Sequence, residues 1–320
     1  MKKVVVIGGG TGNFTVLSGL KQHDVHLSAI VSMADDGGST GVLRDELGVL
    51  PPGDVRQCLV ALSNSSRLMR QLMNYRFEEG GLEGHSFGNL LLSALEKVTG
   101  SFEHAVEEMG RILYIAGKVI PVTTHEVRLN MVLKNQKILQ GEREIYLSQE
   151  IDQGYERLYL EPFPKANRAA LSEIRHADLI IVGPGGLHTS IIPNLLVEGV
   201  ADALKKTHAK CVYVANLMNR KGQTTGYTVG RYVDEIVKYI GKDIFDFVLV
   251  NGQSPDADLI ENYRKEGELV RNDLKGTRVI EAPLLGELKA KSGKDLLKRS
   301  LIRHDSERLA QELMQIVNRI

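Results

Sequence analysis

Five polar segments of the sequence combine glycines with side chains that can bind anions, sugars or metal ions. The first, residues 8–13, reads Gly-Gly-Gly-Thr-Gly-Asn and follows a short apolar run. Glycine lets the backbone approach a phosphate closely, and the free N–H groups of a following helical turn complement negative charge. The predicted phosphate-binding residues are Gly9, Gly10, Thr11, Gly12 and Asn13. The spacing matches neither G-x-G-x-x-G nor the Gly-Lys-Ser/Thr of a P-loop, so the class of nucleotide stays open.

Two adjacent carboxylates, Asp35 and Asp36, follow the second apolar run. An acidic residue about 20 residues past a glycine turn commonly binds a ribose hydroxyl. Paired carboxylates can alternatively hold Mg²⁺ beside phosphates, which makes both residues candidate catalytic groups and Asp36 a candidate metal ligand. Because successive side chains of an extended segment point in opposite directions, we expect only one of the two to face the site. Ser39 is a further candidate ligand contact, and Arg44 and Arg56 add guanidinium groups able to meet a phosphate, although surface salt bridges explain them almost as well.

Of three later polar segments, residues 85–90 precede an apolar helical stretch, and residues 183–190 and 216–226 each follow an apolar run. Residues 183–186 form a second glycine-rich turn, and two such turns in one sheet suggest a crevice between them. Basic side chains after the next apolar run would supply countercharge to a diphosphate. His85 has no partner readable in the sequence, so a catalytic triad is not supported. The candidate ligand-binding residues of these segments are Asn89, Gly185, Gly186, Asn216, Arg220 and Lys221.

The apolar runs that precede these segments predict the elements that position them. They lie at residues 4–7, 27–33, 179–182, 211–214 and 247–250, and their lack of alternation is typical of parallel strands covered on both faces. We therefore predict an α/β fold: a Rossmann-like, doubly wound, mostly parallel sheet with helices on both faces. Ligands of such folds bind at the carboxyl ends of the strands, where the polar segments fall. An ordinary turn or helix cap would explain any one of these polar segments. The prediction of a ligand site therefore depends on their common position at the carboxyl ends of the strands.

The rest of the chain predicts one domain with a small excursion. We expect a single α/β domain over residues 1–320, with an antiparallel β insertion at residues 119–151. Short β-rich runs at residues 127–133 and 144–147 support that insertion. A one-sided apolar pattern predicts a helix at the C-terminus, residues 305–320.

Composition narrows the class of partner. Hydrophobic residues make up 42% and charged residues 25%, as in ordinary globular proteins. Forty basic residues balance forty acidic ones, which argues against a nucleic-acid partner. The cysteines, Cys58 and Cys211, lack metal or disulfide spacing. No stretch approaches the about 20 apolar residues of a membrane span, and the apolar run near the N-terminus is too short for a signal peptide, so we expect no membrane insertion and a cytoplasmic location.

Five motifs in combination resemble one bacterial family. They are the segments 8–12, 33–41, 52–56 (Pro-Gly-Asp-Val-Arg), 85–89 (His-Ser-Phe-Gly-Asn) and 183–186 (Gly-Pro-Gly-Gly). Over nearly its whole length the chain is similar to the gluconeogenesis factor family, also called YvcK-like or uncharacterised protein family 0052. That family shares a superfamily with 2-phospho-L-lactate transferase, CofD.

The resemblance implies a function as well as a fold. It implies a cytoplasmic role in cell shape, morphogenesis and envelope homeostasis during gluconeogenic growth, and binding of UDP-sugars, UDP-N-acetylglucosamine among them. It also implies a serine/threonine kinase as a partner, with Ser306 as the candidate regulatory site, although a helix N-cap explains Ser306 more economically. In the transferase branch an Asp-Asp pair serves a nucleotide-diphospho substrate with Mg²⁺, and Asp35 and Asp36 match that pair in type.

We therefore expect a nucleotide-sugar-binding regulatory factor rather than an enzyme. The alternatives are a CofD-like 2-phospho-L-lactate transferase-type phosphotransferase and an NAD-dependent oxidoreductase. Mg²⁺ is the candidate cofactor, and a homo-oligomer stays open.

Overall fold

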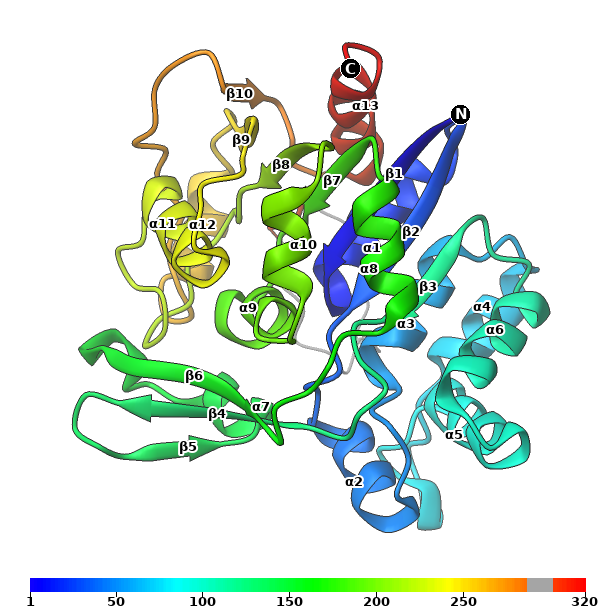
Figure 1. Cartoon of the computed structure of the whole chain (residues 1–320). Coiled ribbons are helices and arrows are strands. Elements are labelled where there is room, and N and C mark those ends of the chain that lie inside the picture. Colours follow the sequence, from blue (N-terminus) through cyan, green and yellow to red (C-terminus); the bar gives the residue numbers. More distant parts are fainter. Residues whose placement is uncertain (287–301) are drawn as a thin grey trace.

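Seven parallel strands form the central sheet, in the order β10-β9-β8-β7-β1-β2-β3 (Figure 1). A separate antiparallel sheet has the order β5-β4-β6. The structure, a computed structural model, describes residues 1–286 and 302–320. The strands are β1 (Lys2–Gly8), β2 (Val25–Val31), β3 (Lys118–Pro121), β4 (Arg128–Leu133), β5 (Ile138–Gln140), β6 (Tyr155–Glu161), β7 (Leu179–Val182), β8 (Lys210–Val214), β9 (Phe247–Asn251) and β10 (Val279–Ala282).

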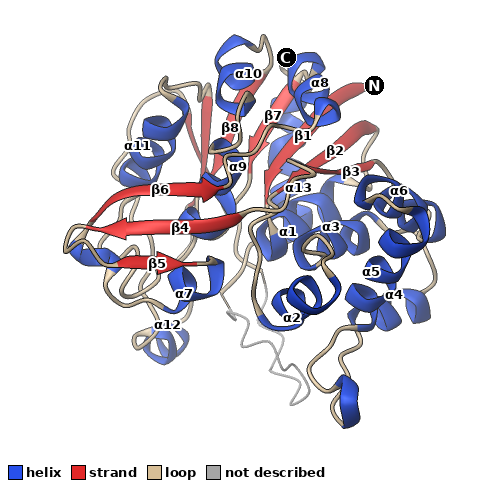
Figure 2. Cartoon of the chain, turned by 60° about the horizontal axis from the view of Figure 1, so that its bottom comes forward, coloured by secondary structure: helices blue, strands red, loops and turns tan. Residues whose placement is uncertain are grey.

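Helices cover both faces of the main sheet. In Figures 1 and 2, α8 and α10 lie on one face, and α1, α3 and α13 lie on the other. The helices are α1 (Gly10–Leu20), α2 (Gly38–Leu47), α3 (Gly53–Leu62), α4 (Arg67–Asn74), α5 (Phe87–Thr99), α6 (Phe102–Ile112), α7 (Glu142–Leu147), α8 (Arg168–His176), α9 (Ile192–Leu195), α10 (Val200–Lys206), α11 (Val229–Ile240), α12 (Ala257–Tyr263) and α13 (Ser306–Val317). Short 3₁₀ turns lie at Gly80–Leu82 and Ile151–Gln153, and Leu187–Ile191 is one turn of π-helix. The predicted α/β class, with a mostly parallel sheet and a small β-rich addition, is confirmed.

The apolar runs are buried as the sequence pattern requires. In β1, Val4, Val6 and Ile7 have no exposed surface, and all four residues of β7 are equally buried. Strand β1 pairs with β2 on one side and with β7 on the other, so the strand order changes direction between β1 and β7. This topological switch point is where a doubly wound sheet opens a crevice for ligands.

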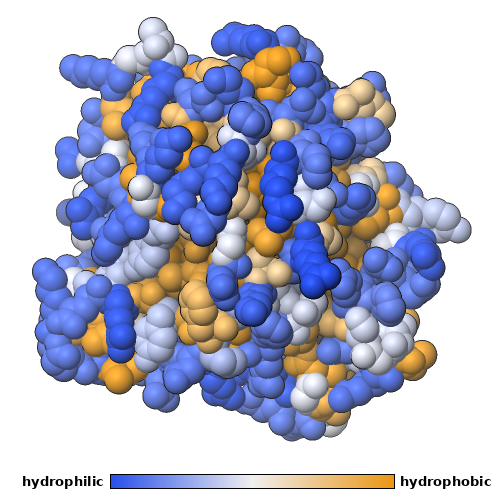
Figure 3. Space-filling view, viewed as in Figure 1, coloured by the Kyte–Doolittle hydropathy of each residue, from blue (hydrophilic) through white to orange (hydrophobic). Residues whose placement is uncertain are grey.

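The small sheet differs from its predicted boundaries. Strand β3 belongs to the main sheet, and β6, which lies beyond residue 151, supplies the third strand of the small sheet. Residues 144–147, predicted as a β-rich run, are helical and belong to α7. Gly141 precedes α7 and two glutamates lie in its first turn, which favours a helix over the alternation of Ile145 and Leu147. Figure 3 shows a mostly hydrophilic face, with hydrophobic residues in several separate patches, one of them near its centre.

The C-terminal helix begins one residue later than predicted. Asp305 caps α13, because its Oδ1 accepts hydrogen bonds from the N–H groups of Glu307 and Arg308, both at 2.9 Å. Ser306 is therefore the first helical residue rather than the cap. The helix packs closely on α1, where an added Cβ at Gly19 would lie 2.0 Å from the Ser306 carbonyl oxygen. None of the described helices combines the length and the apolar character that a bilayer crossing requires.

Candidate functional site

The two glycine-rich turns meet at the switch point. An added Cβ at Gly12 would lie only 1.5 Å from the carbonyl oxygen of Pro184, so the backbones of the two turns are in direct contact. The Gly183 N–H donates to Ile7 O at 3.0 Å, and the buried Asn194 Nδ2 donates to Gly8 O at 3.0 Å. The segments predicted to share one crevice therefore lie side by side.

Asn13 lies behind the first turn rather than at its open edge. Its side chain is fully buried. Added Cβ atoms at Gly8 and Gly183 would lie 2.6 and 2.7 Å from Asn13 Oδ1, so the amide fills the space between the two turns. By contrast, Thr11 is exposed, and its Oγ1 lies 3.4 Å from Gln57 Oε1. We conclude that Asn13 supports the turn from behind, while Thr11 is open to solvent.

A carboxyl group already occupies the N-terminus of α1. Asp54, in the first turn of α3, accepts a hydrogen bond from the Gly10 N–H, and an added Cβ at Gly9 would lie 2.3 Å from Asp54 Oδ2. Burial, followed by the charge of Asp35, raises the pKa of Asp54 to about 8, with Arg56 acting in the opposite direction. The helix N-terminus that was predicted to hold phosphate is thus shared with an acidic side chain.

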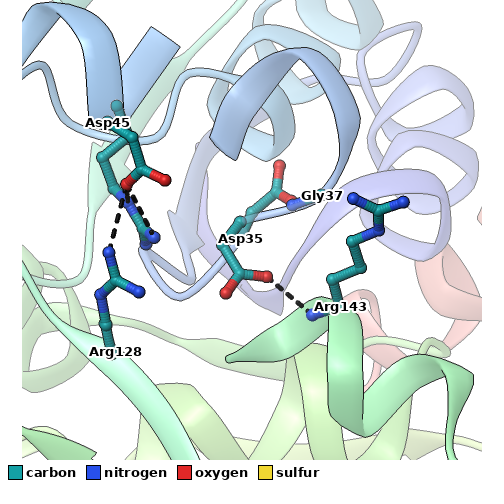
Figure 4. Close-up of polar contacts among 7 residues, drawn as sticks. Asp35, Gly37, Asp45, Arg128 and Arg143 are labelled. Carbon is teal, nitrogen blue, oxygen red and sulfur yellow. Dashed lines mark hydrogen bonds and ion pairs between the residues drawn. The ribbon is translucent and has the colours of Figure 1, made fainter. Parts of the chain in front are cut away.

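Asp35 lies beside Asp54, and Glu142 of α7 completes an acidic group. Asp35 Oδ1 accepts from the Gly37 N–H at 2.9 Å (Figure 4), and burial raises the pKa of Asp35. Burial, followed by the charges of Asp35 and Asp54, raises the pKa of Glu142 to about 9, although Glu142 is hydrogen-bonded to Thr189. Three half-buried carboxyl groups therefore gather around the crevice, and their raised pKa values show that each resists ionisation there.

Asp36 points to a different partner. Its Oδ1 accepts from the Arg143 N–H at 2.7 Å, and an added Cβ at Gly141 would lie 2.1 Å from its Oδ2. It thus holds the beginning of α7, while its neighbour Asp35 lies next to Gly53. This placement separates the two adjacent carboxylates, as the geometry of an extended segment predicts. Among residues 1–286 and 302–320, no set of three His, Cys, Asp or Glu side chains is arranged as a metal site.

The predicted ligand contacts Ser39 and Asn89 belong to one polar network. Ser39 Oγ accepts from Ser86 N and Asn89 Nδ2, both at 3.4 Å, which leaves its hydroxyl proton for His85 Nδ1 at 3.2 Å. Asn89 Oδ1 accepts from the buried Arg56 Nε at 2.8 Å. Ser39 therefore does have a histidine partner, which no sequence spacing revealed.

Arg44 and Arg56 are both buried rather than solvated. Asp45 Oδ1 accepts from Arg44 Nε at 3.4 Å and from Arg128 Nη2 at 3.2 Å (Figure 4). Arg56 also donates from Nη1 to Met73 O at 3.1 Å. Arg56 therefore makes buried contacts in place of a surface salt bridge, whereas Arg44 does form a salt bridge, with the exposed Asp45.

The far wall of the crevice is built from the turns after β7 and β8. Asn216 Nδ2 donates to Gly185 O at 2.7 Å, which ties the two turns together. An added Cβ at Gly186 would lie 2.3 Å from Thr189 Oγ1. Only glycine therefore fits at this position without displacing the Thr189 side chain. The Arg220 guanidinium lies 3.4 Å from the centre of the Tyr146 ring, and Lys221 is exposed. The countercharge assigned to Arg220 is therefore engaged with α7.

Stability should fall as the pH rises through neutrality, because Asp54 and Glu142 keep protons in the folded state that the unfolded chain releases. Their pKa values rise from 3.8 to about 8 and from 4.5 to about 9. Their contribution is therefore fully present below about pH 4 and is lost progressively up to about pH 9. Chemical denaturation across that range should show a smaller loss for Asp54→Asn than for the wild type. Parallel pH profiles for the two proteins would show that Asp54 ionises normally.

Comparisons with known proteins show the family and the fold of this chain. Residues 4–285 match the family model described as 2-phospho-L-lactate transferase CofD. A putative gluconeogenesis factor of Thermoanaerobacterium thermosulfurigenes is 43% identical, covering 98% of this chain and 97% of the relative. The gluconeogenesis factor of Bacillus subtilis is 37% identical over 98% of both chains. A crystal structure of a UPF0052 family member from Bacillus halodurans has a TM-score of 0.88 and 39% identity, covering 98% of both chains.

Proposed function

The chain belongs to the CofD family, within which its relatives are gluconeogenesis factors, and from this premise we propose that it binds a nucleotide-sugar in the crevice between β1 and β7. The ligand we propose is of the UDP-N-acetylglucosamine type. Binding would make the protein a regulatory factor that adjusts cell morphogenesis and envelope homeostasis to the supply of sugar nucleotides under gluconeogenic growth.

The contact between the two glycine-rich turns is the observation that carries the proposal. Gly12 and Pro184 touch at the switch point of the sheet, where doubly wound folds bind nucleotides. A diphosphate placed there would meet the first turn of α1, beside Thr11, and the backbone around Gly185 and Gly186. Backbone N–H groups at a helix N-terminus complement the charge of phosphate.

The acidic side chains set a condition on that ligand. In their ionised forms Asp35, Asp54 and Glu142 would repel a bare diphosphate, because like charges at short range in a partly dry site are costly. Mg²⁺ is usually held by one or two carboxylates together with the phosphates of a nucleotide. The hard oxygen donors of Asp35 and Asp54 suit this ion. We therefore propose that these two side chains hold Mg²⁺ with the diphosphate, and that the ion neutralises the charge of both.

A thermal-shift panel tests the ligand class. UDP-N-acetylglucosamine, UDP-glucose, GDP and NAD would each be added with and without Mg²⁺. A ligand present at about a hundredfold its Kd should add about 2.7 kcal/mol to the free energy of unfolding. We expect the largest shift for the UDP-sugars with Mg²⁺. A shift with NAD and none with any UDP-sugar would reverse the assignment in favour of the oxidoreductase alternative.

A phosphotransferase is the second candidate, and the raised pKa of Asp54, about 8, favours it. A carboxylate that gains its proton near neutral pH can act as a general base toward an alcohol. It would take the hydroxyl proton as the new oxygen–phosphorus bond forms and a nucleoside monophosphate leaves. Release of UMP or GMP that depends on Mg²⁺ and is lost in Asp54→Asn would establish this activity. Tight binding with no release would leave the regulatory function.

A further inference from the structure

Helix α7 spans the carboxyl edge of the main sheet and contacts the loops that follow three of its strands. After β2, Asp36 Oδ1 accepts from the Arg143 N–H at 2.7 Å. After β8, Gln223 Nε2 donates to Ile145 O at 3.1 Å. Helix α7 therefore bridges loops at the edge of the main sheet where the two glycine-rich turns also lie.

The third contact is made by Glu142, whose side chain is hydrogen-bonded to Thr189 after β7. Thr189 Oγ1 lies close to Gly186, on the glycine-rich turn that we assign to the diphosphate. A carboxyl group thus occupies a place beside the glycine-rich turn that would suit a phosphate oxygen.

The far end of α7 is held by a contact of a different kind. The Arg220 guanidinium lies 3.4 Å from the centre of the Tyr146 ring, in a cation–π arrangement. Tyr146 lies four residues after Glu142, so the two side chains share one face of the helix. Because separate contacts hold the two ends of α7, loss of those at the Glu142 end would leave the Tyr146 end tethered.

We propose that α7 is a lid latched over the crevice, and that an entering diphosphate displaces the Glu142 carboxyl group from Thr189. The displacement of Glu142 by the ligand, unlike the latch, rests on the proposed function. Phosphate oxygens accept from the same hydroxyl, and the departure of Glu142 removes one of three clustered carboxyl groups. We call Asp36 the latch, because its side chain holds the start of α7 through the backbone N–H of Arg143. No side chain of α7 takes part in this hydrogen bond.

The latch is measured without ligand. In the ligand-free protein, Asp36→Ala should speed amide hydrogen exchange over residues 141–147 by about tenfold, as expected for the loss of a charge-assisted hydrogen bond. Arg128→Ala is the matched control, because Arg128 also joins the small sheet to the segment after β2, through Asp45, but outside α7. It should leave that exchange unchanged. Equal exchange in Asp36→Ala and the wild type would overturn the latch.

The displacement of Glu142 is tested by stopped-flow measurement of UDP-N-acetylglucosamine binding in the presence of Mg²⁺. Glu142→Ala should raise the association rate about tenfold, because the competing side chain is gone. Arg143→Ala, which keeps the backbone bond to Asp36, should associate like the wild type. Unchanged or slower association in Glu142→Ala would overturn the displacement. Absence of binding in every protein, wild type included, would overturn both the displacement and the proposed function. The amide hydrogen exchange of the ligand-free proteins would still decide whether Asp36 is the latch.

Discussion

Gly12→Ala is expected to destabilise the protein by about 3 kcal/mol, the upper range for overpacking of a filled interior. The added methyl group would lie 1.5 Å from the carbonyl oxygen of Pro184 and 2.6 Å from its carbonyl carbon. Both are backbone atoms, so no side-chain rotation relieves the clash, and the two turns must separate. The free energy of unfolding from urea denaturation measures the effect, and binding of the UDP-sugar should be lost with it.

Gly81→Ala is the control for this substitution. Gly81 lies in an exposed 3₁₀ turn, and an added Cβ there meets no atom within 4 Å. We expect its stability to stay within about 0.5 kcal/mol of the wild type. If Gly12→Ala were as stable as Gly81→Ala, the two glycine-rich turns would not be in contact.

Asp35→Asn is expected to weaken Mg²⁺-dependent binding of the UDP-sugar by about tenfold to a hundredfold, the range found when groups that support a metal are removed. The neutral amide is a poorer ligand for Mg²⁺ than a carboxylate. Burial already raises the pKa of Asp35, so the free protein should lose no stability through the change. Isothermal titration calorimetry with and without Mg²⁺ separates the loss of metal-dependent affinity from any general loss.

The adjacent residue supplies the comparison for Asp35. Asp36→Asn keeps an oxygen that can accept from the Arg143 N–H, so α7 should stay in place and Mg²⁺-dependent affinity should stay close to that of the wild type. Because Asp35 and Asp36 are adjacent residues of the same type, Asp35→Asn and Asp36→Asn each remove one carboxylate from the same part of the protein. Equal losses in the two variants would mean that total charge, and not a metal contact by Asp35, governs binding.

The sequence was sufficient to predict five of the seven strands of the main sheet and the edge at which its polar segments gather, whereas β3 was assigned to the insertion and β10 was not predicted. Unalternated apolar runs such as those of β1 and β7 have one stable environment, between two layers of helices, and parallel strands bring their carboxyl ends to one edge. The small sheet was less predictable. Residues 144–147 alternate like a strand but belong to α7, because the preceding Gly141 and the acidic first turn favour a helix.

The two glycine-rich turns and Asp35 were named from the sequence, but the carboxyl groups of Asp54 and Glu142 that lie near them were not. The two glycine-rich turns could be located from their spacing, whereas Glu142 carried no local signal that it would meet Thr189 or Asp35. Such contacts join segments that are far apart in the sequence, and only the packing of α7 creates them. Asp54 had a weaker signal, since it follows two prolines and a glycine at the start of a helix, yet its bond to Gly10 depends on the packing of α3 against α1.

A crystal structure of the protein soaked with UDP-N-acetylglucosamine and Mg²⁺ tests the central claim most directly. We predict difference density for the diphosphate between the turn at residues 9–12 and the turn at residues 183–186, with the metal ion against Asp35 and Asp54. Density for the nucleotide at any other place on the molecule, with those two turns still bare, would contradict the account.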